Sequence, residues 1–137
     1  MQTTTLTAPV SNAQLWTGRV LSGLFILFML FDSSIKLVPL AVVTETSAQI
    51  GLPATAAFAR TLGILGLVSL ILYAYPRTAV LGAILLTAYM GGAVATHFRI
   101  GSPLFTHTLF GVYLGVILWG GLWFRDPRVR ALIPFSN

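Results

Sequence analysis

The sequence contains no cysteine. A chain without thiols cannot form a disulfide, supply a thiolate nucleophile, or bind an iron–sulfur cluster or a zinc ion through sulfur. Thiol redox chemistry by the protein itself is therefore excluded. The sequence also has no haem, iron–sulfur or nucleotide motif.

Charged residues are scarce as well. They make up 8% of the 137 residues, against about 25% in soluble domains, and only three of them are acidic. Hydrophobic residues account for 56%, and the mean hydropathy is +0.89. This composition excludes a soluble domain and predicts a membrane protein. The net charge of +5 does not indicate nucleic-acid binding, because the basic residues are scattered along the ends of apolar segments.

Four apolar segments each have about the ~20 residues that a helix needs to cross a bilayer. We therefore predict an all-α integral membrane protein: a four-helix bundle that runs up, down, up and down, as one domain of residues 15–134. A polar N-terminal tail, 1–14, and a short basic C-terminal tail, 125–137, flank the spans. The predicted spans are Trp16–Leu37, Ala57–Tyr75, Thr78–His97 and Thr106–Phe124.

The arginines predict how the bundle is oriented. Most of them fall on the side shared by both termini and the second connection, and the positive-inside rule then puts both termini in the cytoplasm. The N-terminal tail has no basic start and no cleavage site, so we expect the first span to stay as an uncleaved anchor. The arginines on the predicted cytoplasmic side are Arg19, Arg77, Arg125, Arg128 and Arg130.

Polar side chains are expected to gather at the opposite end of the bundle. At about 1.5 Å per residue they fall in one band about 10 Å thick. Asp32 is too short and too deep to reach water, so we expect an ion pair with Lys36 and with an interhelical arginine, Arg60 or Arg99. The alternatives are a purely structural Asp32–Lys36 pair and, for Lys36 and Arg60, interfacial anchoring. The candidate ligand-binding residues are Asp32, Lys36, Arg60, His97, Arg99 and His107.

Two further features belong to this band. The connection 39–53 is the longest, and a short interfacial helix in it is expected to carry Glu45 over the band as a lid. His97 and His107 flank a short link and, with Asp32, form an alternative metal set of two histidines and one carboxylate. The spacing matches no recognised ligand motif, so we predict no metal and favour hydrogen bonding or proton transfer to a bound ligand.

Small residues recur at intervals of four along the third and fourth spans. Faces of this kind let membrane helices approach closely. The residues predicted to serve helix packing are Ala83, Gly91, Ala95, Gly111 and Gly115.

Four pieces of the sequence carry a resemblance to a known family: FDSSIKL at 31–37, PRTA at 76–79, YMGGAVATHFRIGSPL at 89–104 and WGGLWFRDP at 119–127. From Gln14 to Pro134 the chain resembles the DoxX-like family of bacterial membrane proteins, and GGAVATH-x-R-x-G-x-P-L is the most specific piece. The resemblance implies a multi-pass four-helix bundle in the bacterial inner (plasma) membrane. The wider family resembles the membrane subunit of an archaeal thiosulfate:quinone oxidoreductase, a mycobacterial partner of oxidative-stress enzymes and receptor-assembly chaperones. It implies no catalytic residue set.

Two functions follow as hypotheses. The first is an accessory protein of the lipid bilayer that holds a small lipid-soluble or anionic molecule, such as a quinone, in the polar band in support of a membrane redox process. The second is a non-enzymatic partner that assembles or stabilises a larger membrane or redox complex, or a homo-oligomer, through the glycine-lined faces. We do not expect the chain to be an enzyme on its own.

Overall fold

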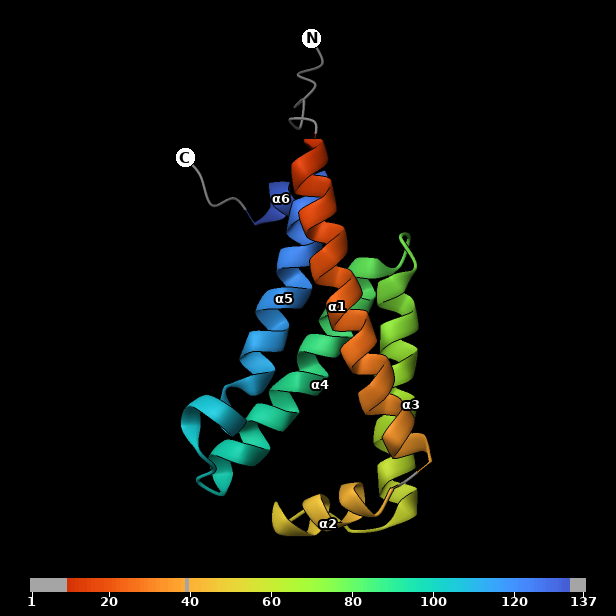
Figure 1. Ribbon diagram of the computed structural model, residues 1–137, viewed down its shortest axis with the longest axis vertical. Helices are drawn as coiled ribbons and strands as arrows, with labels where there is room; N and C mark the ends of the chain where they lie inside the picture. Colours follow the sequence, from red (N-terminus) through yellow and green to blue (C-terminus); the bar gives the residue numbers. More distant parts are fainter. Residues whose placement is uncertain (1–9, 39, 134–137) are drawn as a thin grey trace.

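A computed structural model describes residues 10–38 and 40–133, and its regular elements are all helical over these ranges. Four helical segments are long and apolar enough to cross a membrane, which confirms the predicted fold class and implies a lipid bilayer around the chain. These segments alternate in direction, so the start of the first span and the end of the fourth span lie at the same end of the bundle (Figure 1). The elements are α1 (Asn12–Leu37), α2 (Ala41–Gln49), α3 (Ala56–Ala74), α4 (Ala79–Arg99), the π-helical turn η1 (Leu104–Thr108), α5 (Phe110–Arg125) and α6 (Pro127–Leu132).

Local capping explains why the first helix begins at Asn12 and not at Trp16. The Gln14 backbone N–H donates to Ser11 Oγ at 3.2 Å, and the Ser11 backbone N–H donates to Gln14 Oε1 at 3.3 Å. This capping box satisfies N–H groups that would otherwise lack an acceptor at the start of the helix. Residues 1–9 of the predicted N-terminal tail lie outside the described residues.

The C-terminal segment begins with a helix that packs back on α5. The Asp126 side chain caps α6 by accepting the Arg128 backbone N–H at 2.9 Å, and Pro127 occupies the first helical position, where its missing N–H costs nothing. Val129 is buried, and the Arg130 guanidinium donates to the carbonyl oxygens of α5. The predicted C-terminal tail is thus helical over 127–132, and its residues 134–137 lie outside the described part of the chain.

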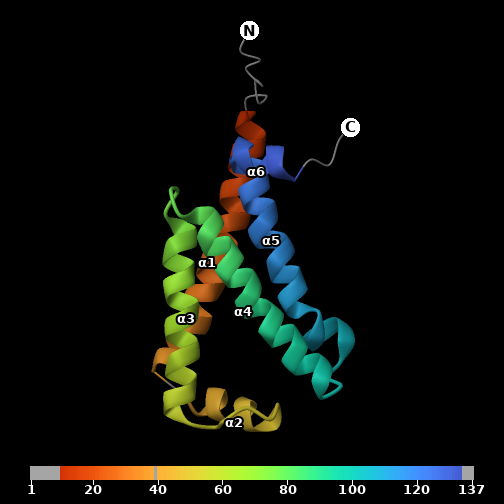
Figure 2. The ribbon, with the colours of Figure 1, turned by 180° about the vertical axis from the view of Figure 1, so that it is seen from behind.

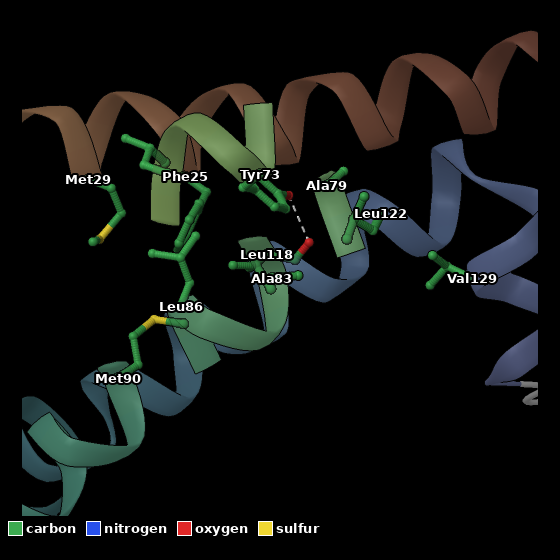
Figure 3. Close-up of a cluster of buried hydrophobic side chains, with 11 residues drawn as sticks. Phe25, Met29, Tyr73, Ala79, Ala83, Leu86, Met90, Leu118, Leu122 and Val129 are labelled. Atoms are coloured by element: carbon green, nitrogen blue, oxygen red, sulfur yellow. Dashed lines mark hydrogen bonds between the residues drawn. The ribbon is translucent and has the colours of Figure 1, made fainter. Parts of the chain in front are cut away.

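The core lies in the half of the bundle nearest the chain ends. Tyr73 is completely buried there, in edge-to-face contact with Phe25 at 5.5 Å between ring centroids. Its hydroxyl donates to the Leu118 carbonyl oxygen at 2.9 Å (Figure 3). It also lies 2.9 Å from Ser22 Oγ. Because the phenol has both partners inside the bundle, its burial leaves no polar group unpaired.

Close helix contacts in this half depend on glycines that the four-residue pattern does not single out. A Cβ on Gly18 of α1 would lie 2.7 Å from the Gly121 carbonyl oxygen of α5, and one on Gly82 of α4 would collide with the Tyr73 backbone of α3. Only glycine fits at such crossings. Of the residues predicted for packing, Ala83 is fully buried and a Cβ on Gly111 would lie 2.9 Å from Val94 Cγ2. The remaining three do not pack against another helix closely. A Cβ added at Gly91 or Gly115 would meet nothing within 4 Å, and Ala95 is exposed.

The helices separate towards the other end of the bundle. In both views α4 diverges from α1 and α3 as it runs towards η1, and α2 lies across that end (Figures 1 and 2). The short helix expected in the first connection is therefore present, as α2. The space between α1, α2, α3 and α4 at this end holds a cavity lined by residues of all four helices.

Candidate functional site

A cavity of about 470 Å³ occupies this space between α1, α2, α3 and α4. Its size falls within the range of pockets that hold a small organic ligand. Apolar side chains form most of its wall: Ile35 from α1, Val42 and Val43 from α2, Ile50 and Leu52 after α2, and Phe58 and Leu62 from α3. The polar side chains are Asp32, Lys36, Thr46, Ser47, Tyr89, Thr96 and His97.

Lys36 is the centre of the polar part of the cavity. Its ammonium group donates to Asp32 Oδ2 at 2.7 Å and to Tyr89 Oη at 2.8 Å, and it lies 5.3 Å from the centroid of the Tyr89 ring. Asp32 and Lys36 are one helical turn apart on α1, with the acid first, so their side chains meet without distortion. The hydrogen bond to Tyr89 joins α1 to α4 at this level.

The predicted ion pair between Asp32 and an arginine of another helix, Arg60 or Arg99, is wrong. Within the described ranges, Asp32 forms an ion pair with Lys36 alone. Arg99 lies at the last turn of α4, where that helix has diverged from α1, and its Nη2 donates to the Ile50 carbonyl oxygen at 3.0 Å. Tyr89 lies two to three turns earlier on α4, and the long side chains of Lys36 and Tyr89 meet there instead.

Tyr89 is the partner of Lys36 that the sequence interpretation missed, and Thr46, Ser47 and Thr96 are further polar lining residues that it did not name. The span around Tyr89 is apolar, and an aromatic residue in such a span usually packs in the core or against lipid. The available signal was its position: Tyr89, Thr96 and His97 are spaced by seven and eight residues, and so lie on one face of α4. That face is the one that lines the cavity.

Ser33 lies beside this group and has an unused hydroxyl. The residue is 1% exposed, and its Oγ has no hydrogen-bond partner among the described residues. Its neighbour Ser34 shows the usual alternative, a bond from Oγ to the Leu30 carbonyl oxygen at 2.6 Å. A Cβ on Gly66 would lie 3.0 Å from Ser33 Oγ and 3.8 Å from Tyr89 Cζ, so both hydroxyl-bearing side chains adjoin this glycine.

The two histidines lie together at the end of α4. Their ring centroids are 5.9 Å apart, His97 Nδ1 is 3.0 Å from Ser102 Oγ, and His107 Nδ1 is 2.8 Å from Thr106 Oγ1. His97 lines the cavity, whereas His107 is exposed on η1 and does not. Asp32 is held by Lys36, and the described residues contain no group of three side chains able to hold a metal ion. The structure therefore does not bring the alternative metal set together.

The other predicted site residues surround the cavity without lining it. Arg99, through its bond to the Ile50 carbonyl oxygen, ties the end of α2 to the end of α4. Gly51 makes this possible: its φ of 78° is left-handed, and a Cβ there would lie 2.9 Å from Arg99 Nη2. Glu45 on α2 and Arg60 on α3 are exposed.

A family model, described as the DoxX-like family, matches residues 20–121. The chain belongs to the DoxX-like family. The match runs from α1 into α5 and includes every residue named above as lining the cavity. No curated protein and no solved structure matches the chain. The four spans and the DoxX-like match together identify a multi-pass membrane protein.

Proposed function

We propose that this DoxX-like protein binds a small neutral amphiphile with a carbonyl oxygen, of the quinone class, in the cavity between α1, α2, α3 and α4, in support of a membrane redox process. The observation that carries the proposal is the pair of hydrogen bonds made by Lys36. We also propose that the membrane is the bacterial inner membrane and that the cavity faces its outer side, because the arginines favour cytoplasmic termini.

The hydrogen bond from Lys36 fixes what Tyr89 can offer a ligand. An ammonium group is a donor only, so in this contact the Tyr89 oxygen accepts. The phenol keeps its own hydrogen, for which the described residues provide no acceptor. Since Tyr89 lines the cavity, that hydrogen is available to an acceptor oxygen on a bound molecule.

The charge balance favours a neutral ligand. Asp32 and Lys36 are the oppositely charged pair of the described lining, and they neutralise each other across 2.7 Å. Arg60 and Arg99, which would have favoured an anion, do not line the cavity. A quinone fits this environment because its carbonyl oxygens only accept hydrogen bonds and its ring and tail suit apolar walls.

Ligand-dependent thermal stability tests the proposal. A ligand that binds only the folded state stabilises it by about 2.7 kcal/mol at one hundred times its Kd. Short-chain quinone analogues should therefore raise the Tm of the purified protein, whereas fatty acids of similar size should not. Tyr89→Phe should weaken quinone binding by about fivefold, as expected for a lost hydrogen bond of about 1 kcal/mol.

Tyr75→Phe is the matched control, because Tyr75 is an exposed tyrosine at the other end of α3. It should bind quinone as the wild type does. Equal binding by the Tyr89→Phe variant, or no Tm shift with any quinone, would contradict the proposal.

A further inference from the structure

A second concavity, a groove of about 720 Å³, runs between α4 and α5 on the other face of α4 from the cavity. It is almost wholly apolar. Thr87 and Trp119 carry polar groups into it, but the indole N–H donates to the threonine Oγ1 at 2.8 Å, so these two groups satisfy each other. Gly91 and Gly115 form open parts of its floor, since a Cβ on either would meet nothing within 4 Å.

The dimensions of the groove suit a hydrocarbon chain. Its lining on α5 extends from Gly111 to Phe124, which is about 20 Å along the helix, enough to cover the about 15 Å that half of a bilayer's hydrocarbon layer measures. The volume over that length corresponds to a mean cross-section of about 40 Å². A helix about 10 Å across needs roughly twice that area. A partner helix would thus remain outside the groove and leave the glycines uncovered.

One end of the groove lies beside a positively charged side chain, Arg130. Trp123 and Ile133 line that end, and the Arg130 guanidinium lies 4.5 Å from the centroid of the Trp123 ring. Arg130 donates to two carbonyl oxygens and to the Gln14 side chain, all neutral acceptors, so these contacts leave its charge uncompensated. The one carboxylate at this end of the described chain, Asp126, is paired with Arg128.

We propose that this groove is a binding site for an anionic phospholipid, with one acyl chain along the glycines and the phosphate beside Arg130. Each arginine near a membrane surface contributes about 1 kcal/mol to the binding of anionic lipid, which is about fivefold in affinity. The charged end gives the site its preference for an anion, and the apolar groove gives it a preference for a chain over a soluble phosphate.

Native mass spectrometry of the delipidated protein, titrated with phosphatidylglycerol or phosphatidylcholine, tests this site. The wild type should retain phosphatidylglycerol, and the double variant Gly91→Leu/Gly115→Leu, which fills the groove, should lose it. Gly23→Leu is the matched control: Gly23 lies on α1, and a Cβ there also meets nothing within 4 Å. Arg130→Gln should lower the preference for phosphatidylglycerol about fivefold, while Arg130→Lys should keep most of it.

The outcomes separate the possible occupants. Inorganic phosphate and glycerol phosphate should not compete with the lipid; competition by either would reduce the site to a soluble-anion site and overturn the role of the groove. Equal retention by the filled double variant and the Gly23→Leu control would also overturn it. A wild type that forms a dimer without bound lipid, and becomes monomeric when the groove is filled, would assign this face to a partner helix instead.

Discussion

Replacing Lys36 by methionine should destabilise the folded protein by about 2–3 kcal/mol. Removing one partner of a fully buried ion pair costs about 3–5 kcal/mol, because the other charge is left without compensation. The Lys36 and Asp32 side chains keep 19% and 25% of their exposure, so part of that cost is relieved and we expect a value at or below the lower end. Methionine retains most of the apolar length of the lysine stem, which limits the change in packing.

The double variant Asp32→Asn/Lys36→Met separates the lost ion pair from lost packing. It contains no unpaired charge, so it should be more stable than Lys36→Met alone, with a coupling of about 1–2 kcal/mol between the two positions. Reversible unfolding in mixed micelles, followed by circular dichroism, measures all four proteins. Strictly additive losses would refute the pairing. An equal coupling between Asp32 and Arg99 would refute the assignment of Lys36 as its sole charged partner.

Three further predictions concern packing, pH and orientation. Gly121→Leu should destabilise the protein by at least about 2 kcal/mol, because its Cβ would collide with Ser22 of α1, whereas Gly23→Leu should be close to neutral in the same unfolding assay. Burial raises the pKa of the Asp126 carboxyl, but hydrogen bonds from the Arg128 side chain and backbone outweigh it and hold that pKa below its ordinary value. The ionised Asp126 carboxylate therefore stabilises the folded protein above about pH 4, and this stabilisation is lost as the pH falls through the lowered pKa. Asp126→Asn should remove this acid-dependent step in Tm. Glu45 and Ala131 are exposed, and each can be replaced by a single cysteine in this cysteine-free chain. An impermeant thiol reagent should label the cysteine at 45 from outside intact cells and the cysteine at 131 only from the cytoplasmic side. The reverse labelling would mean that the orientation is inverted.

The spans were predictable because each is a long apolar run that ends near a charged or turn-forming residue. Predicted limits differ from those of the membrane-crossing segments by at most four residues, and the largest difference, at Asn12, comes from a capping box whose polar residues looked like part of the tail. The helix in the first connection was also predictable. The helical start of the C-terminal segment was not, because six residues carry too little periodicity to be recognised.

The position of each polar residue along its helix was predictable, but the direction of its side chain was not. Counting residues along alternating helices places the candidate residues towards one end of the bundle, as the helix bounds have them. The rotation of each helix about its own axis depends on contacts with its neighbours, such as the close approach of Gly18 to Gly121. Arg60 and His107 therefore fall at that end without lining the cavity, and the uncharged Tyr89 lines it.

Photolabelling with a short-chain quinone that carries a diazirine tests the proposed ligand site most directly, because mapping the labelled residues also distinguishes the cavity from the groove. The account predicts saturable labelling within the α4 segment 89–97 and in α2, reduced by Tyr89→Phe and by excess unlabelled quinone, and unaffected by filling the groove at Gly91 and Gly115. Labelling confined to the groove-lining part of α5, or labelling that excess quinone does not reduce, would contradict it.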